Sequence, residues 1–132
     1  MKENEIKVLK VEPMKAPTVV TLNNDLDALQ KAVSEGCEHQ GLIEIIPIAD
    51  GISILCNEEG KLLGLPGNRR LGNDIIAGIF YVVGDNAETG ELCSLTDRQL
   101  MFYNMVFAIP EVFTDEEVES SLFFEVSDDW EV

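Results

Sequence analysis

The chain has 132 residues, enough for one domain with a buried core, and its hydrophobic fraction of 45% excludes general disorder. It carries 25 acidic and 9 basic residues, which gives a formal net charge of −16. Such a surface repels phosphate groups, so direct binding to nucleic acid or to a lipid surface is disfavoured and a basic partner is favoured.

The sequence lacks the usual signals for export, a membrane, a metal or a cofactor. No apolar run approaches the roughly 20 residues of a membrane helix, and the opening residues MKENEIKVLK lack the apolar core of a signal peptide. The cysteines Cys37, Cys56 and Cys93 are widely spaced, and His39 is the only histidine. We therefore expect a cytoplasmic protein with reduced cysteines, no metal site and no cofactor.

The first part of the chain predicts two strands and a helix. Residues 6–11 and 17–22 are rich in β-branched side chains and are separated by a short connection, which indicates a hairpin. A helix is expected over residues 25–35, with Asn23 or Asn24 as its N-cap and a glycine after its last turn.

The middle of the chain predicts a second hairpin and a further strand. Residues 42–47 and 52–56 flank Asp50-Gly51, a dipeptide typical of tight turns. Residues 64–72 hold three glycines and a proline, and we expect a loop there. Residues 79–83, Ile-Phe-Tyr-Val-Val, form the most convincing strand in the sequence.

Two capping boxes mark helices in the last part of the chain. Thr96 and Gln99 open a helix over residues 97–105, and Thr114 and Glu117 open a short acidic helix. Residues 111–132 carry nine acids and no base, so they hold more than half of the net charge. We expect them to form an acidic, aromatic-containing C-terminal extension of the domain.

These elements predict an α+β domain over residues 1–110. Its sheet is mainly antiparallel and built from hairpins, and two or three helices pack on it. The hydrophobic periodicity predicts one core. Its expected members are Leu26, Leu29, Val33, Ile45, Ile54, Phe80 and Val82.

The chain contains several short motifs whose order and spacing are specific as a set. They are Val11-Glu12-Pro13, Ile48-Ala49-Asp50-Gly51, Asn57-Glu58-Glu59-Gly60-Lys61, Leu65-Pro66 with Asn68-Arg69, Asp74-Ile75-Ile76-Ala77-Gly78 before Phe80, and Leu95-Thr96-Asp97. On these motifs, residues 6–105 resemble DUF3846, a family of unknown function from phages and mobile elements. The chain departs from the family at Gly78-Ile79-Phe80, where Gly-Thr-Phe is usual, and so lacks one hydroxyl. The resemblance implies a fold and a phage or mobile-element setting, and no activity.

Two interpretations fit Asn68, Arg69, Arg70 and Asp74. In the first, Arg69 and Asp74 form a bidentate ion pair that clamps the glycine-containing loop, and Asn68 ties a turn. In the second, these four residues line a site for a nucleotide or another anion, because arginine is well shaped to bind phosphate. The glycines match no known phosphate-binding loop, and the first interpretation is favoured.

The acidic extension also has two interpretations. In the first, its aromatic side chains pack on the domain. In the second, the segment presents a surface to a basic partner. The candidate contact residues for such a partner are Glu116, Glu117, Glu119, Asp128, Asp129 and Trp130.

The favoured function is therefore that of a small non-enzymatic binding protein. Its most concrete form is a DNA mimic that inhibits a host DNA-binding or defence enzyme, since spaced carboxylates imitate duplex phosphates. The alternative is an anion-binding module that uses residues 68–70. An enzyme is disfavoured, because the sequence pairs no nucleophile with a base and offers no set of metal ligands.

Overall fold

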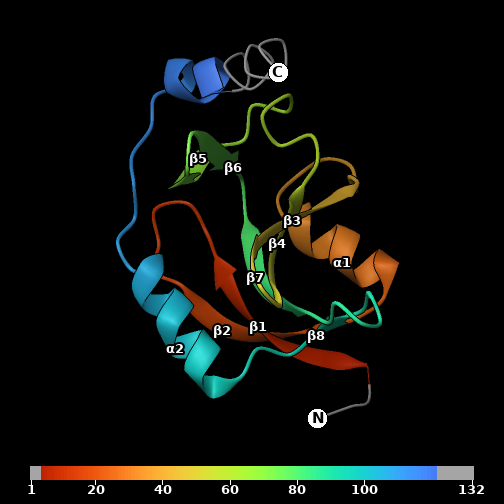
Figure 1. Ribbon diagram of the computed structural model, residues 1–132. Helices are drawn as coiled ribbons and strands as arrows, with labels where there is room; N and C mark the ends of the chain where they lie inside the picture. The colour runs from red at the N-terminus through yellow and green to blue at the C-terminus, as the bar shows by residue number, and fades with distance from the viewer. Residues whose placement is uncertain (1–3, 122–132) are drawn as a thin grey trace, which may run out of the picture.

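The computed structural model describes residues 4–121, and Figure 1 shows a strongly twisted sheet with helices on both faces. All strand pairings are antiparallel, in the order β2-β1-β7-β4-β3, and β8 also pairs with β7. The predicted α+β class is confirmed. The six strands are β1 (Glu5–Val11), β2 (Thr18–Asn23), β3 (Ile43–Ala49), β4 (Ile52–Asn57), β7 (Phe80–Asp85) and β8 (Leu92–Cys93).

Strand β7 joins the two predicted hairpins into one sheet. It inserts between β1 and β4, so that Phe80–Val82 pair with the end of β1 while the same residues face β4 on the other side. Because β7 and β4 are central strands covered on both faces, almost every residue of each is buried. This double burial explains why residues 79–83 show an unbroken apolar run.

The core has two halves, one on each face of the sheet, and the prediction of a single core is wrong. Alternate residues of a strand point to opposite faces. Phe80 and Val82 therefore pack with α2 (Asp97–Val106), whereas Tyr81 and Val83 pack with α1 (Leu26–Val33). The two helices thus cover opposite faces, as Figure 1 shows.

Two of the seven predicted core residues are exposed. Leu26 is 60% exposed in the first turn of α1, and Ile45 is 42% exposed on the edge strand β3, which has a neighbour on one side only. The five confirmed core residues are Leu29, Val33, Ile54, Phe80 and Val82.

The predicted N-cap of α1 is also wrong by one or two residues. Asp25 is the N-cap, and its side chain accepts a hydrogen bond from the amide of Ala28. Asn23 is the last residue of β2, and the Asn24 side chain instead donates to the carbonyl of Leu92. The capping box of α2 at Thr96 and Gln99 is confirmed.

Residues 64–72, expected to be a loop, contain a strand. β5 (Gly67–Leu71) pairs with β6 (Asp74–Ala77) in a separate hairpin. Gly67 pairs with Ala77 and Arg69 with Ile76, so Asn68 is an extra residue, a β-bulge. Glycine, asparagine and aspartate are depleted in strands, and their presence here hid the hairpin from sequence analysis.

The start of the acidic extension docks on this second hairpin. Residues 115–121 are helical, and Val118 packs with Ile75 and Ala77 of β6. A Cβ atom on Gly67 would lie 2.9 Å from both Phe113 and Val118, so only glycine leaves room for this contact.

Phe80 provides a test of the core. Its side chain is fully buried and contacts the Phe107 ring edge-to-face, with 5.2 Å between the ring centroids. We expect Phe80→Ala to lower the free energy of unfolding by about 3–5 kcal/mol, because a large cavity remains in a packed sheet. The exposed edge residue Ile45 is the control, and Ile45→Ala should cost less than about 1 kcal/mol in chemical denaturation. Equal losses for the two variants would contradict the placement of β7 at the centre.

Candidate functional site

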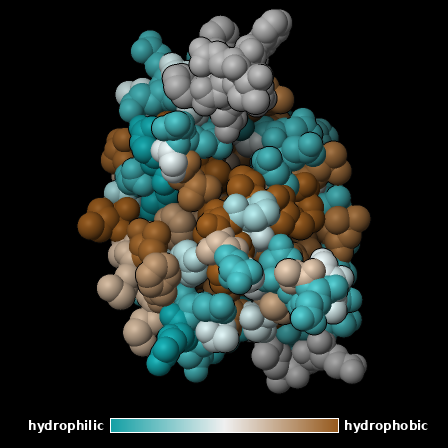
Figure 2. Space-filling model, viewed as in Figure 1, coloured by the Kyte–Doolittle hydropathy of each residue, from teal (hydrophilic) through white to brown (hydrophobic). Residues whose placement is uncertain are grey.

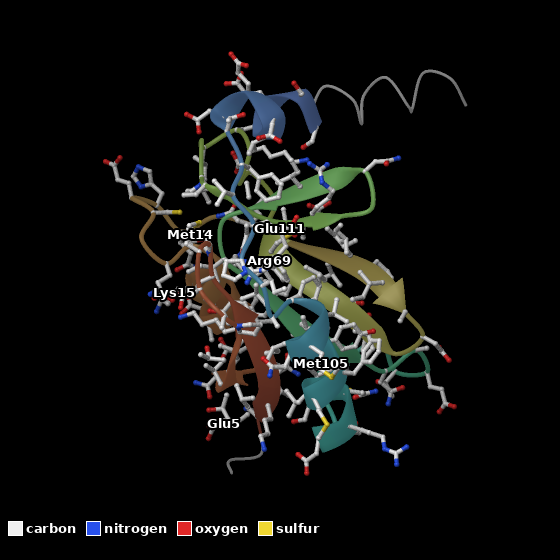
Figure 3. All side chains as sticks on the ribbon, turned by 90° about the vertical axis from the view of Figure 1, so that its left-hand side faces the viewer. Glu5, Met14, Lys15, Arg69, Met105 and Glu111 are labelled. Carbon is white, nitrogen blue, oxygen red and sulfur yellow. The ribbon has the colours of Figure 1, made fainter. Side chains whose placement is uncertain are left out.

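The most unusual side chain in the fold is Arg69, which is 1% exposed. Its guanidinium donates five hydrogen bonds, which matches its five N–H groups. Nε and Nη2 bind the carbonyl of Phe107 at 3.2 and 3.0 Å, and Nη2 also binds the carbonyl of Lys15 at 2.6 Å. Nη1 binds the carbonyl and side-chain oxygens of Asn68 at 3.2 and 2.8 Å. Figure 3 shows Arg69 at this junction, between Lys15 and Glu111.

Asn68 extends the same network. Its side-chain nitrogen donates to the carbonyl of Val11 at 2.8 Å and to that of Gly78 at 2.9 Å. Val11 is the last residue of β1, and Gly78 lies between β6 and β7. The bulge turns two consecutive side chains inward, and Asn68 and Arg69 together hold the second hairpin against the main sheet and α2.

The positive charge of Arg69 is balanced mainly by backbone dipoles. None of the described acidic side chains lies within ion-pair distance of it. Phe107 is the C-cap of α2, where helix carbonyls lack partners and the helix dipole is negative. Burial lowers the pKa of Arg69, and the charge of Glu111 raises it. A guanidinium stays protonated in proteins, so Arg69 is charged at neutral pH.

The predicted ion pair between Arg69 and Asp74 is wrong. Asp74 forms an ion pair with Lys61 and accepts a hydrogen bond from the amide of Ile75 at 2.8 Å. Arg69 does fix the glycine-containing segment, but through backbone carbonyls that no sequence pattern reveals. Phe107 and Lys15 contribute main-chain atoms only, so sequence analysis could not identify them as partners.

Arg70 lies apart from Arg69. Its side chain is exposed and lies over the ring of Phe113, 5.6 Å from the ring centroid, while its amide donates to Glu111. The four residues of the predicted anion site, Asn68, Arg69, Arg70 and Asp74, therefore do not converge on one pocket. Two are buried in hydrogen bonds, and the other two have different partners.

A small cavity of about 190 Å³ lies beside the Lys61–Asp74 ion pair. Its lining also includes Glu44 and Cys56. Burial and the nearby carboxylates raise the pKa of the Cys56 thiol to about 12, so this thiol is protonated at neutral pH and is a poor nucleophile. No group of three or more metal-ligating side chains occurs in the part of the chain that the structure describes.

A wider groove of about 460 Å³ lies between the 115–121 helix and the β5–β6 hairpin. Glu116 and Glu117 line it together with Arg70 and Thr114. The second predicted capping box is confirmed here: the Glu117 amide binds the Thr114 hydroxyl at 3.1 Å, and the Glu117 carboxylate accepts from the Thr114 amide at 2.9 Å. These bonds to Thr114 lower the pKa of Glu117 and keep it ionised.

Only some of the predicted partner-binding residues can be placed. Glu116, Glu117 and Glu119 are exposed on the 115–121 helix. Asp128, Asp129 and Trp130 lie outside the described residues, as do the aromatic residues that precede them.

The fold and these contacts define a small antiparallel α+β domain in which an Asn-Arg bulge anchors a second hairpin. The chain belongs to the DUF3846 family, a domain of unknown function, whose model matches residues 6–108. No curated protein and no solved structure matches the chain. Over residues 4–121, no helix combines the length and the apolar content needed to cross a bilayer.

A double-mutant cycle tests the anchor. We expect Arg69→Met to lower the free energy of unfolding by roughly 2–6 kcal/mol, because the buried carbonyl of Phe107 and the partly buried carbonyl of Lys15 each lose their donor at about 1–3 kcal/mol. Asp74→Asn should have a separate effect, and the two should add within about 0.5 kcal/mol, because the two side chains share no partner. A large coupling energy in urea denaturation would show that Arg69 and Asp74 interact, and it would contradict the separate partners described above for the two side chains. Arg70→Met is the matched control and should cost less than about 1 kcal/mol.

Proposed function

We propose that this protein is a cytoplasmic, non-enzymatic accessory protein that binds a basic protein partner through its acidic segment, residues 111–132. The observation that carries the proposal is that Asp115, Glu116, Glu117 and Glu119 are all exposed on one short helix whose inner side is anchored by Val118. An anchored helix presents its charges in a fixed arrangement, which favours recognition over general solvation.

The charge spacing supports the DNA-mimic form of this proposal. Four carboxylates occur within the five residues 115–119. With a rise of 1.5 Å per residue, this is about 1.9 Å of helix axis per charge. Duplex DNA carries one charge per about 1.7 Å. In the phage or mobile-element setting that the family resemblance implies, the partner would be a host DNA-binding or defence enzyme.

The charge distribution also favours this segment over the rest of the surface. Residues 1–110 have a net charge of −7, and 9 basic residues are interspersed among their 16 acids. The ion pairs that join described residues to one another all lie within this region. The carboxylates of residues 115–119 form none of these pairs and remain available to an external cation.

The anion-binding alternative finds less support in the geometry. A phosphate group needs the arginine N–H groups free, and those of Arg69 are used in hydrogen bonds to the protein itself. Arg70 is the one arginine of the pair at the surface, and Glu116 and Glu117 line the groove beside it. These carboxylates repel an anionic ligand.

Charge neutralisation tests the proposal. We compare the wild type with a variant that carries Glu116→Gln, Glu117→Gln, Glu119→Gln, Asp128→Asn and Asp129→Asn, as baits in a bacterial lysate at low and high salt. Glutamine at position 117 keeps the capping box, so the helix should persist. We expect the wild type to capture basic DNA-binding proteins at low salt and to release them at high salt, and the variant to lose them.

A second variant removes five charges elsewhere and serves as the control. It carries Glu38→Gln, Asp50→Asn, Glu88→Gln, Glu91→Gln and Asp97→Asn, all at exposed positions. It should capture the same proteins as the wild type. If a captured protein is first bound to duplex DNA, addition of the wild type should release the DNA. Addition of the first variant should not. Retention of the same proteins by the first variant, with unchanged salt dependence, would refute the role of the acidic segment.

A further inference from the structure

One side of the molecule exposes a series of large apolar side chains. It follows α2 and the segment after it, and each of its large side chains is more than half exposed. We call this the α2 patch, and its members are Met101, Phe102, Met105, Val106, Ile109 and Val112. Figure 2 shows apolar side chains along its left-hand margin, the side on which α2 lies. Figure 3, turned to face this side, shows Met105 on the outer side of α2.

The helical spacing brings the four α2 members of the patch together. Met101 and Met105 are four residues apart, as are Phe102 and Val106, so they form two adjacent rows on one side of α2. Six such side chains expose on the order of 600 Å², which is at the upper end for the largest apolar patch of a monomer and marks an interaction surface. With its rim, the patch approaches the roughly 800 Å² per partner of a specific interface.

Five of the six patch residues lie in an uncharged stretch of a very acidic protein. Residues 99–110 contain no charged side chain, although 26% of the whole chain is charged. Two copies of a chain with a net charge of −16 repel each other wherever acids face acids. Two copies can approach most closely where acids are few, so the charge pattern that discourages self-association elsewhere favours α2 as the point of contact.

We propose that the α2 patch is the interface of a homodimer, in which α2 packs against α2 of a second copy across a two-fold axis. A two-fold interface brings the same patch from each copy together and requires that the patch fit itself. Two apolar rows on a helix satisfy this requirement, because the ridges of one helix pack into the grooves of the other.

The dimer is compatible with the proposed function and independent of it. In Figure 1 α2 and the 115–121 helix lie at opposite ends of the molecule, so packing of α2 against α2 leaves the 115–121 helix of each copy accessible. Arg69 also contributes, because its bonds to the carbonyl of Phe107 fix the end of α2 to β5 at the point where the segment with Ile109 and Val112 begins.

Sedimentation equilibrium of the full chain over a micromolar to submillimolar series tests the proposal. We expect a mass twice the 14.6 kDa of the chain at the higher concentrations. Because added salt screens the repulsion between the copies, the dimer should tighten as salt rises. This is opposite to the salt dependence of binding to a basic partner, so the two proposals fail separately.

Three variants locate the interface. Met105→Glu places two like charges at the two-fold interface and should raise the dimer dissociation constant at least about tenfold. Leu62→Glu adds the same charge at a similarly exposed position, 74% against 72%, in the loop before β5, and should leave the dimer almost unchanged. Met105→Leu preserves volume and should retain the dimer.

A wild type that is monomeric at every concentration and salt would overturn the proposal. Equal weakening by Met105→Glu and Leu62→Glu would also overturn it, because the effect would then come from net charge and not from the patch. Far-UV circular dichroism of each variant verifies that the fold is intact, as expected for changes at exposed positions.

Discussion

The hydrogen bonds from the Arg69 guanidinium to the carbonyl of Phe107 hold the two parts of this fold together. On one side of this contact is the main sheet with α2, and on the other is the β5–β6 hairpin, which carries the start of the acidic extension. Burying a charged guanidinium costs several kcal/mol, and this cost is offset only because every N–H group has a partner. The network therefore tolerates little change, since a missing partner leaves a buried polar group unsatisfied.

Both proposed surfaces depend on this contact. The acidic helix is fixed on the second hairpin through Val118, and the hairpin is fixed on the domain through Asn68 and Arg69. The α2 patch continues past Phe107 into a segment without helix or strand, and the same guanidinium holds that junction. A single buried arginine thus helps to position both the acidic helix and α2, which lie at opposite ends of the molecule (Figure 1).

Local sequence signals predicted the elements that are determined by interactions between residues close together in the sequence. Both capping boxes, at Thr96 and at Thr114, and the apolar run over residues 79–83 were interpreted correctly, because each depends on side chains close together in the sequence. The elements that depend on distant partners were missed. The β5 strand has poor strand propensity, and it forms because its bulge places Asn68 and Arg69 against groups up to 57 residues away.

The candidate site follows the same division. The exposure of Glu116, Glu117 and Glu119 could be inferred from their density of charge alone. The ion pair of Asp74 with Lys61 could not, because several basic residues were available and only the tertiary structure selects one. The apolar character of residues 99–110 is visible in the sequence. A local pattern does not show whether other elements cover an apolar helix side, so the exposure of these side chains could not be predicted.

Hydrogen exchange of the arginine side chains by NMR tests the central contact most directly. The chain has three arginines, Arg69, Arg70 and Arg98, and the latter two are exposed and serve as internal references. We expect the Nε proton of Arg69 to exchange with water orders of magnitude more slowly than the other two, because it is buried and bound to the carbonyl of Phe107. Exchange of Arg69 at the rate of Arg70 would show that the guanidinium is not held in this network, and it would contradict the role of Arg69 as the link between the two parts of the fold.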